Sequence, residues 1–168
     1  MRFAILILTI SVAIGLVSCK PKVEHGARSL DAMMLVYFEA LSTRDVDMFS
    51  QLLPDVELSW GVYNEADRAD KKAYIKTVED KNKSLEEAFR RHAEEFGGVK
   101  VSVTGLDSEP EQALNVVWSA EPYGKLPNTT VIVSRDGKLY RYKFSNIMQY
   151  RGRYYLEESP FVDIKHWE

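Results

Sequence analysis

Apolar residues recur with helical spacing in the segment from residue 30 to residue 41. They occupy positions i, i+3, i+4, i+7, i+8 and i+11, which form one stripe on a helix. The stripe consists of Leu30, Met33, Met34, Tyr37, Phe38 and Leu41. Ser29 stands directly before it and is a favoured N-cap residue. The pattern predicts a helix that starts after Ser29 and buries this stripe.

A second, shorter apolar pattern follows the polar residues 42–45. Val46, Phe49, Leu52 and Leu53 repeat the helical spacing and predict a short inward-facing helix. Pro54 ends it, because the residue before a proline avoids the helical region. The two segments together predict a helical hairpin.

The middle of the chain combines a short alternating segment with a long charged one. Residues 56–63 alternate between two faces, with Val56, Leu58, Trp60 and Val62 on one of them, which predicts a strand with one buried face. Residues 65–96 carry two apolar stripes at helical spacing, with a break expected at Asn82 and Ser84. The charged positions predict a solvated helix face, with a protein-docking surface as the alternative. Gly97-Gly98 ends this helix.

From residue 99 onward the chain alternates like strands separated by turns. Strands are expected over 99–104, 114–119, 130–134, 139–150 and 154–158. Asp136-Gly137 is a strong hairpin turn, Arg151-Gly152 a second turn, and Pro160 is expected to close the sheet. Strands joined by tight turns are largely antiparallel. The sequence therefore predicts an α+β fold, with N-terminal helices packed on a curved, mostly antiparallel sheet, in one domain over residues 29–168.

The first residues have the character of an export signal. Arg2 precedes an apolar run from Phe3 to Val17, which is shorter than the roughly twenty residues a membrane span needs. The run ends in Leu16-Val17-Ser18-Cys19, which resembles the lipobox of bacterial lipoproteins. This resemblance implies that residues 1–18 are a signal peptide and that Cys19 carries lipid after cleavage. An ordinary secretory signal or a membrane-anchoring helix with an incidental cysteine is the alternative.

The resemblance also implies a location. Two or three acyl chains on Cys19 would hold the protein permanently at a cell membrane, since each buried methylene contributes about 0.8 kcal/mol. Lys20 follows the cysteine where Asp would signal retention in the inner membrane, which favours the periplasmic face of the outer membrane if the organism has two membranes. Residues 19–28 are polar, with Pro21 and Gly26, and are expected to form a tether.

Charge and cysteine content exclude several classes of function. The net charge of −3 lacks the basic surface that a nucleic-acid-binding protein needs. One cysteine allows no internal disulfide, so the exported domain must be stabilised by its core. No phosphate-binding loop, nucleophile motif or cofactor motif is present, and the three histidines lack the spacing of a metal site.

The order of the predicted elements resembles that of the cone-shaped fold of the nuclear transport factor 2 superfamily. Local sequences that carry the resemblance are 37–41 (YFEAL), 44–49 (RDVDMF), 96–99 (FGGV) and 152–156 (GRYYL). The superfamily includes ketosteroid isomerase, scytalone dehydratase, polyketide cyclases and many bacterial lipoproteins. The resemblance implies a cone enclosed by helices and sheet. In the enzymes of the superfamily an Asp or His in this cone acts as a general base.

Inward-facing aromatic residues are the candidates for contact with a ligand. These candidates are Trp60, Tyr74, His92, Trp118 and Phe144. His92 lies on the apolar side of a helix and is the best single candidate for a base, with a core histidine as the alternative. No residue is assigned a catalytic role.

These observations predict a non-catalytic binding module in the cell envelope. A dry cavity lined by Trp60 and Trp118 would favour a small apolar ligand. An exposed patch around Tyr140, Tyr142, Tyr150 and Tyr155 would favour a protein partner. The alternatives are a small enzyme of isomerase or dehydratase type and a structural subunit of an envelope complex. A homodimer formed through the sheet is consistent with each of them.

Overall fold

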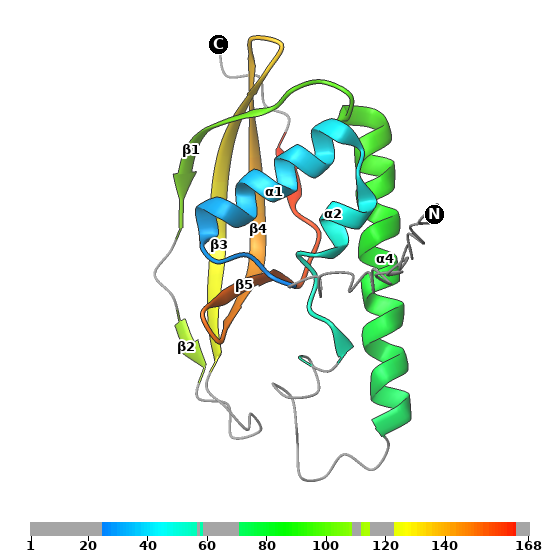
Figure 1. Cartoon of the computed structure of the whole chain (residues 1–168). Helices are drawn as coiled ribbons and strands as arrows, with labels where there is room; N and C mark the ends of the chain where they lie inside the picture. Colours follow the sequence, from blue (N-terminus) through cyan, green and yellow to red (C-terminus); the bar gives the residue numbers. More distant parts are fainter. Residues whose placement is uncertain (1–24, 57, 59–70, 109–111, 115–122, 164–168) are drawn as a thin grey trace, which may run out of the picture.

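The computed structural model describes residues 25–56, 58, 71–108, 112–114 and 123–163. Helices come first along the chain: α1 (Leu30–Thr43), α2 (Val46–Ser50) and α4 (Lys71–Phe96). Strands follow: β1 (Ser102–Asp107), β2 (Gln112–Leu114), β3 (Tyr123–Arg135), β4 (Lys138–Tyr150), β5 (Arg153–Leu156) and β6 (Phe161–Asp163). Figure 1 shows α1 lying across one face of β3 and β4, with α4 standing alongside beyond α2. The predicted α+β class is confirmed.

The predicted helical hairpin is confirmed, together with its caps. Ser29 Oγ accepts a hydrogen bond from the backbone N–H of Ala32 at 3.1 Å, which caps α1. Asp45 Oδ1 accepts from the backbone N–H of Met48 at 2.9 Å and caps α2. Arg44, between the helices, has φ 59, in the left-handed region that ends many helices. The chain therefore reverses direction within two residues.

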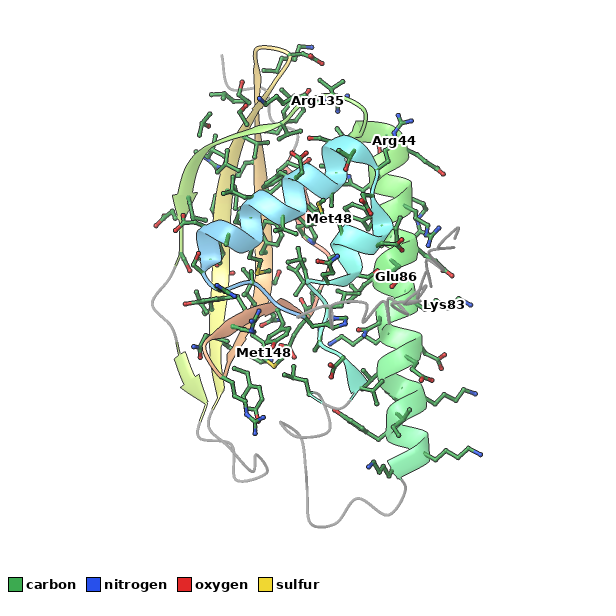
Figure 2. All side chains as sticks on the ribbon, in the orientation of Figure 1. Arg44, Met48, Lys83, Glu86, Arg135 and Met148 are labelled. Carbon is green, nitrogen blue, oxygen red and sulfur yellow. The ribbon has the colours of Figure 1, made fainter. Side chains whose placement is uncertain are left out.

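The helix α4 is continuous, so the predicted break at Asn82 and Ser84 is wrong. Ser84 Oγ donates to the carbonyl of Asp80 at 2.9 Å, one turn earlier in the same helix. Asn82 Nδ2 donates to the carbonyl of Pro54 at 2.8 Å, so its amide anchors the helix to the chain after α2. Both polar side chains find partners without opening the helix. The predicted solvated face is confirmed, and Figure 2 shows Lys83 pointing outward and Glu86 lying toward α2.

The strand predicted over residues 56–63 is wrong at its two described positions, because Val56 and Leu58 are helical. Asp55 explains the difference: its Oδ1 accepts from the backbone N–H of Leu58 at 2.6 Å, as an N-cap residue does. A local cap therefore prevails over the alternating pattern at this point. The remainder of the predicted strand, with Trp60, lies outside the described residues.

The strands form one antiparallel sheet in the order β1-β3-β4-β5, with β2 also pairing with β3 and β6 with β4. Both predicted turns are confirmed: Asp136 and Gly137 have φ 49 and 74, and Arg151 and Gly152 have φ 48 and 71. Two positive φ angles in succession define the hairpin turn that matches the twist of antiparallel strands. Pro160 does not close the sheet, since β6 follows it and pairs with the middle of β4.

The core fills the space between the helices and one face of the sheet. The predicted stripe of α1 is confirmed: from Met33 to Leu41 its members are at most 2% exposed. On β4, Tyr142, Phe144, Met148 and Tyr150 are buried as their alternation predicts. Ile147, of opposite parity, is buried as well.

Candidate functional site

A pocket of about 170 Å³ lies between the helices and the segment that leads into β6. Its walls are mostly aromatic, and its lining residues are Tyr37, Phe49, Ala88, Phe89, His92, Ser159 and Pro160. They come from α1, α2, α4 and the chain before β6, so the pocket exists only when the whole fold is assembled. We call it the His92 pocket.

His92 supplies an imidazole to the wall of this pocket. Its Nε2 lies 3.1 Å from the hydroxyl of Tyr142 on β4, a hydrogen-bond distance. Burial, with a smaller contribution from the positive charge of Arg135, lowers the pKa of His92 from its ordinary value of 6.5 to about 4. His92 is therefore neutral near pH 7, with one ring nitrogen as a donor and the other as an acceptor.

The two phenols beside His92 are neutral as well. Burial raises the pKa of Tyr142 and outweighs the opposing positive charge of Arg135. Burial also raises the pKa of Tyr37, and the proximity of Tyr142 adds to this effect. Of the described residues that line the His92 pocket, none carries a charge at neutral pH. The pocket offers hydrogen-bonding groups to a ligand without an ionic partner.

The pocket wall is rigid because aromatic rings brace it from behind. Among the described residues, the ring of Tyr37 has five aromatic neighbours with centroids 5.1–6.4 Å away, all in edge contacts. Phe49 and Phe89 stack at 4.2 Å with an angle of 9° between their planes. Edge and offset contacts of this kind stabilise aromatic clusters beyond their buried area. The positions of Tyr37 and His92 are therefore set before any ligand enters.

Of the ligand-contact residues predicted from the sequence, some lie at the His92 pocket, one lies at a second pocket, and the others fall outside the described residues. His92 lines the pocket, and Phe144 packs behind it, with its ring centroid 5.3 Å from that of Tyr37 and 1% exposure. Tyr74 lies elsewhere on α4. Trp60, Trp118 and Cys19 lie outside the described residues.

Tyr74 borders a second pocket, of about 240 Å³, between α4 and the end of the sheet. Its other lining residues are Pro54, Thr77, Val78, Lys81, Asn82 and Glu157. Glu157 is 5% exposed and forms an ion pair of 3.3 Å with Lys125. The surface of this second pocket is largely apolar, and its buried carboxylate already has a cationic partner.

The parts of the site that come from distant segments have no signal in the sequence. Tyr37 was assigned to the apolar stripe of α1, and no signal distinguished it from the other core residues. Tyr142 was considered as part of an exposed tyrosine patch, yet Tyr142, Tyr150 and Tyr155 are at most 3% exposed and Tyr140 is half-buried. These tyrosines therefore do not form the exposed patch that would favour a protein partner.

Within the part of the chain that the structure describes, no helix combines the length and apolar character needed to cross a membrane. Among the same residues, no three His, Cys, Asp or Glu side chains gather as a metal site would require. Comparisons of the chain with protein-family models, with curated proteins and with solved structures find no match in any of the three.

Proposed function

We propose that this protein is a lipid-anchored binding protein of the bacterial cell envelope. Acylated Cys19 would hold it at the membrane, and the His92 pocket would bind a small, uncharged, largely aromatic or apolar molecule. The observation that carries the binding proposal is the neutral imidazole of His92 in the lining of an aromatic pocket, with its Nε2 3.1 Å from the hydroxyl of Tyr142. Binding sites for small molecules commonly combine apolar walls with a few placed polar groups.

The proposed fold family is that of nuclear transport factor 2. Its support is the order of elements, with a helical hairpin and a long helix followed by a curved antiparallel sheet. In such a cone the ligand would enter between the helices and the sheet, where the His92 pocket lies. Likeness of fold carries no activity with it, so the functional proposal rests on the residues of the pocket.

The size and chemistry of the pocket restrict its ligand. At about 170 Å³ it is smaller than the roughly 300–1,000 Å³ of pockets for drug-sized molecules. A charged ligand would lose its hydration without gaining an ionic partner, which is costly. A single ring that bears a hydroxyl or carbonyl group would fill the aromatic space and hydrogen-bond to His92.

Binding is better supported than catalysis for His92. A general base works best when its pKa lies near the working pH. The pKa of about 4 makes His92 a weak base, and its Nε2 already faces the Tyr142 hydroxyl. An isomerase or dehydratase reaction that relied on this imidazole would therefore have little driving force for proton abstraction.

Native mass spectrometry of the full-length protein, extracted from its own membranes in mild detergent, tests this proposal. We expect the mass of residues 19–168 plus acyl chains, with a small molecule retained. The variant Ala88→Phe fills the pocket and is expected to lose the molecule while keeping the acyl chains. Ala73→Phe, at an exposed position of the same helix, is the matched control. An unprocessed mass would contradict the anchor, and acyl chains without a retained molecule would contradict the ligand.

A homodimer through the outer face of the sheet is the second candidate role. Asp107, Thr130, Lys143 and Phe161 occupy paired positions on four adjacent strands and so share one face. Phe161 is 66% exposed, and an open groove of about 500 Å³ crosses the same face. A two-fold axis near Thr130 would place Asp107 of each copy against Lys143 of the other.

A further inference from the structure

The segment that leads into α1 is bound to the sheet and does not hang free from it. The backbone N–H of Ala27 donates to the carbonyl of Tyr154 at 3.0 Å, and the N–H of Tyr154 donates to the carbonyl of Ala27 at 2.9 Å. Gly26 donates to the carbonyl of Gln51 at 2.7 Å. An added Cβ on Gly26 would lie 2.5 Å from the ring of Tyr155, so the backbone sits directly on that ring. The attachment point of the domain is thus fixed on β5.

This attachment leaves little chain between the domain and Cys19. From Cys19 to His25 there are six residue steps, 25 − 19, and an extended chain spans at most about 3.6 Å per residue. The reach is therefore about 20 Å. The strand β4 has 13 residues and so extends over about 40 Å. A lipid on Cys19 could not reach around the domain, and the side that carries Ala27 must face the bilayer.

Three arginines gather on that side. The bridge between Ala27 and Tyr154 is antiparallel, so Arg28 stands opposite Arg153. Arg153 Nη1 donates to the carbonyl of Gly26 at 2.9 Å, and Arg151 lies two residues before Arg153 at the exposed tip of the β4–β5 turn. Arg28 is exposed as well.

Acidic groups also lie near this cluster. Asp31, in the first turn of α1, is exposed near Arg28. Asp55 lies close enough to act on Tyr155. Burial raises the pKa of Tyr155, and the charge of Asp55 adds to this effect. The charges of Arg153 and Arg151 oppose it. In the sequence of the tether, Lys20 and Lys22 add two positive charges and Glu24 adds one negative charge. Counted over the tether sequence and these described residues, five basic side chains stand against three acidic ones, whereas the whole chain has a net charge of −3.

We propose that Arg28, Arg151 and Arg153 form a membrane-facing surface that contacts anionic phospholipid headgroups and orients the domain. This inference rests on the proposed lipid anchor. The tip at Arg151-Gly152 would then point toward the bilayer and the tip at Asp136-Gly137 away from it, because β4 connects the two turns. Each basic residue near an anionic membrane surface strengthens attraction by a factor of about five.

The test uses the full-length, acylated protein in vesicles of phosphatidylcholine, with or without phosphatidylglycerol. A fluorescent probe is placed on the cysteine of Asp31→Cys, near the surface, or of Lys138→Cys, near the far turn. Acylation blocks Cys19, so only the new thiol is labelled. Nitroxide-labelled headgroups then quench the probe according to its distance from the bilayer. We expect several-fold stronger quenching at residue 31 than at residue 138, most strongly with phosphatidylglycerol.

The double variant Arg28→Gln/Arg151→Gln keeps the hydrogen bond from Arg153 to Gly26. It is expected to remove most of the increase in quenching at residue 31 that phosphatidylglycerol causes. The control Lys76→Gln/Lys83→Gln, on the exposed face of α4, removes the same amount of charge and should leave this increase in quenching unchanged. Equal quenching at both probes, or no effect of the arginine variant, would overturn the proposed surface. Loss of acylation, seen separately in the mass, would instead overturn the anchor.

Discussion

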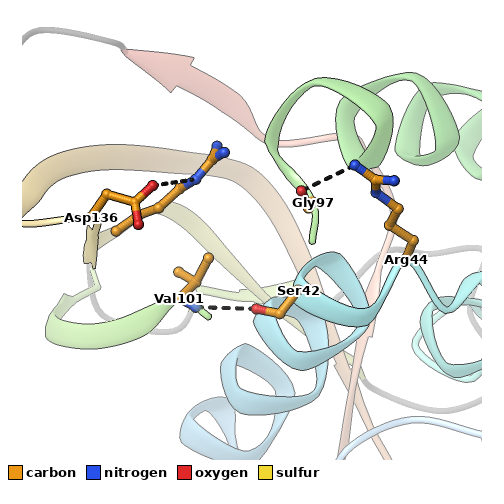
Figure 3. Close-up of polar contacts among 6 residues, drawn as sticks. Ser42, Arg44, Gly97, Val101 and Asp136 are labelled. Atoms are coloured by element: carbon orange, nitrogen blue, oxygen red, sulfur yellow. Dashed lines mark hydrogen bonds and ion pairs between the residues drawn. The ribbon is translucent and has the colours of Figure 1, made fainter. Parts of the chain in front are cut away.

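The guanidinium of Arg44 donates a hydrogen bond to the backbone carbonyl of Gly97, with 3.3 Å between Nη2 and the oxygen. Its Nε also donates to the carbonyl of Ala93 at 3.1 Å, so one side chain from the end of α1 satisfies two carbonyls at the end of α4. Ser42 joins the same corner, because its Oγ accepts from the N–H of Val101 at 3.2 Å (Figure 3). This corner fixes the start of β1 relative to both helices.

We expect Gly97→Ala to destabilise the protein by about 2 kcal/mol, the usual cost of overpacking. A Cβ at residue 97 would lie 2.7 Å from both the carbonyl of Leu41 and Cγ of Arg44, and closer still to the carbonyl of Ala93. Urea unfolding followed by circular dichroism measures the change. Gly105→Ala is the control, since its Cβ would meet only Ile132, at 3.6 Å or more. Equal stability of the two variants would contradict the crowding at this corner.

His92 makes stability depend on pH below neutrality. In the folded protein its pKa is about 4, whereas an unfolded histidine titrates near 6.5. Between these values the unfolded state binds more protons, so stability is lost as the pH falls from about 6.5 to about 4. With allowance for solvent screening of a partly exposed ring, the loss is about 1–2 kcal/mol. Urea midpoints of the wild type and His92→Gln across this range measure it. Parallel pH profiles would contradict the assignment.

The helices were predictable because each buries one continuous stripe against the sheet. In α1 the periodic spacing, the Ser29 cap and the burial agree, so local and long-range requirements coincide. The errors occur where a side chain has a backbone partner that the pattern does not reveal. Asp55 caps a helical turn in place of the predicted strand, and Asn82 bonds to Pro54 across 28 positions of sequence.

The site was predictable only in its helical half. His92 was found because an imidazole on an apolar helix face is chemically unusual. Its partner Tyr142 lies 50 positions later on a strand, and its role depends on the register of β4 against the helices. A change of register by one residue would turn that hydroxyl to the outer face, so spacing within the strand could not assign it.

Tyr142→Phe is expected to weaken the protein by about 1–2 kcal/mol, because it leaves His92 Nε2 in a half-buried site without the hydroxyl. The same variant should reduce retention of the proposed ligand in the native mass spectrum. Tyr140→Phe, a half-buried tyrosine on the same strand, is the control and should change neither property. If both variants behave alike, the hydroxyl of Tyr142 has no special role in the pocket.

In the proposed dimer, Asp107 of each copy pairs with Lys143 of the other, so variants at these two residues test how the copies are arranged. Lys143→Asp would place like charges opposite each other twice and is expected to yield monomers, detected by native mass spectrometry. The double variant Asp107→Lys/Lys143→Asp restores both pairs with reversed sign and should restore the dimer. Dimers in the single variant, or monomers in both, would contradict pairing between these two residues.

Phe161→Ser provides an independent test of the same face. It removes the most exposed large apolar side chain among the described residues, 66% exposed on β6. In the proposed dimer this ring would be covered, so its loss should weaken association by about 2 kcal/mol, or roughly thirtyfold in the dissociation constant. Leu35→Ser is the matched control, because Leu35 is 62% exposed but belongs to α1, the helix that lies across the other face of the sheet. Equal weakening by both variants would place the contact away from the sheet.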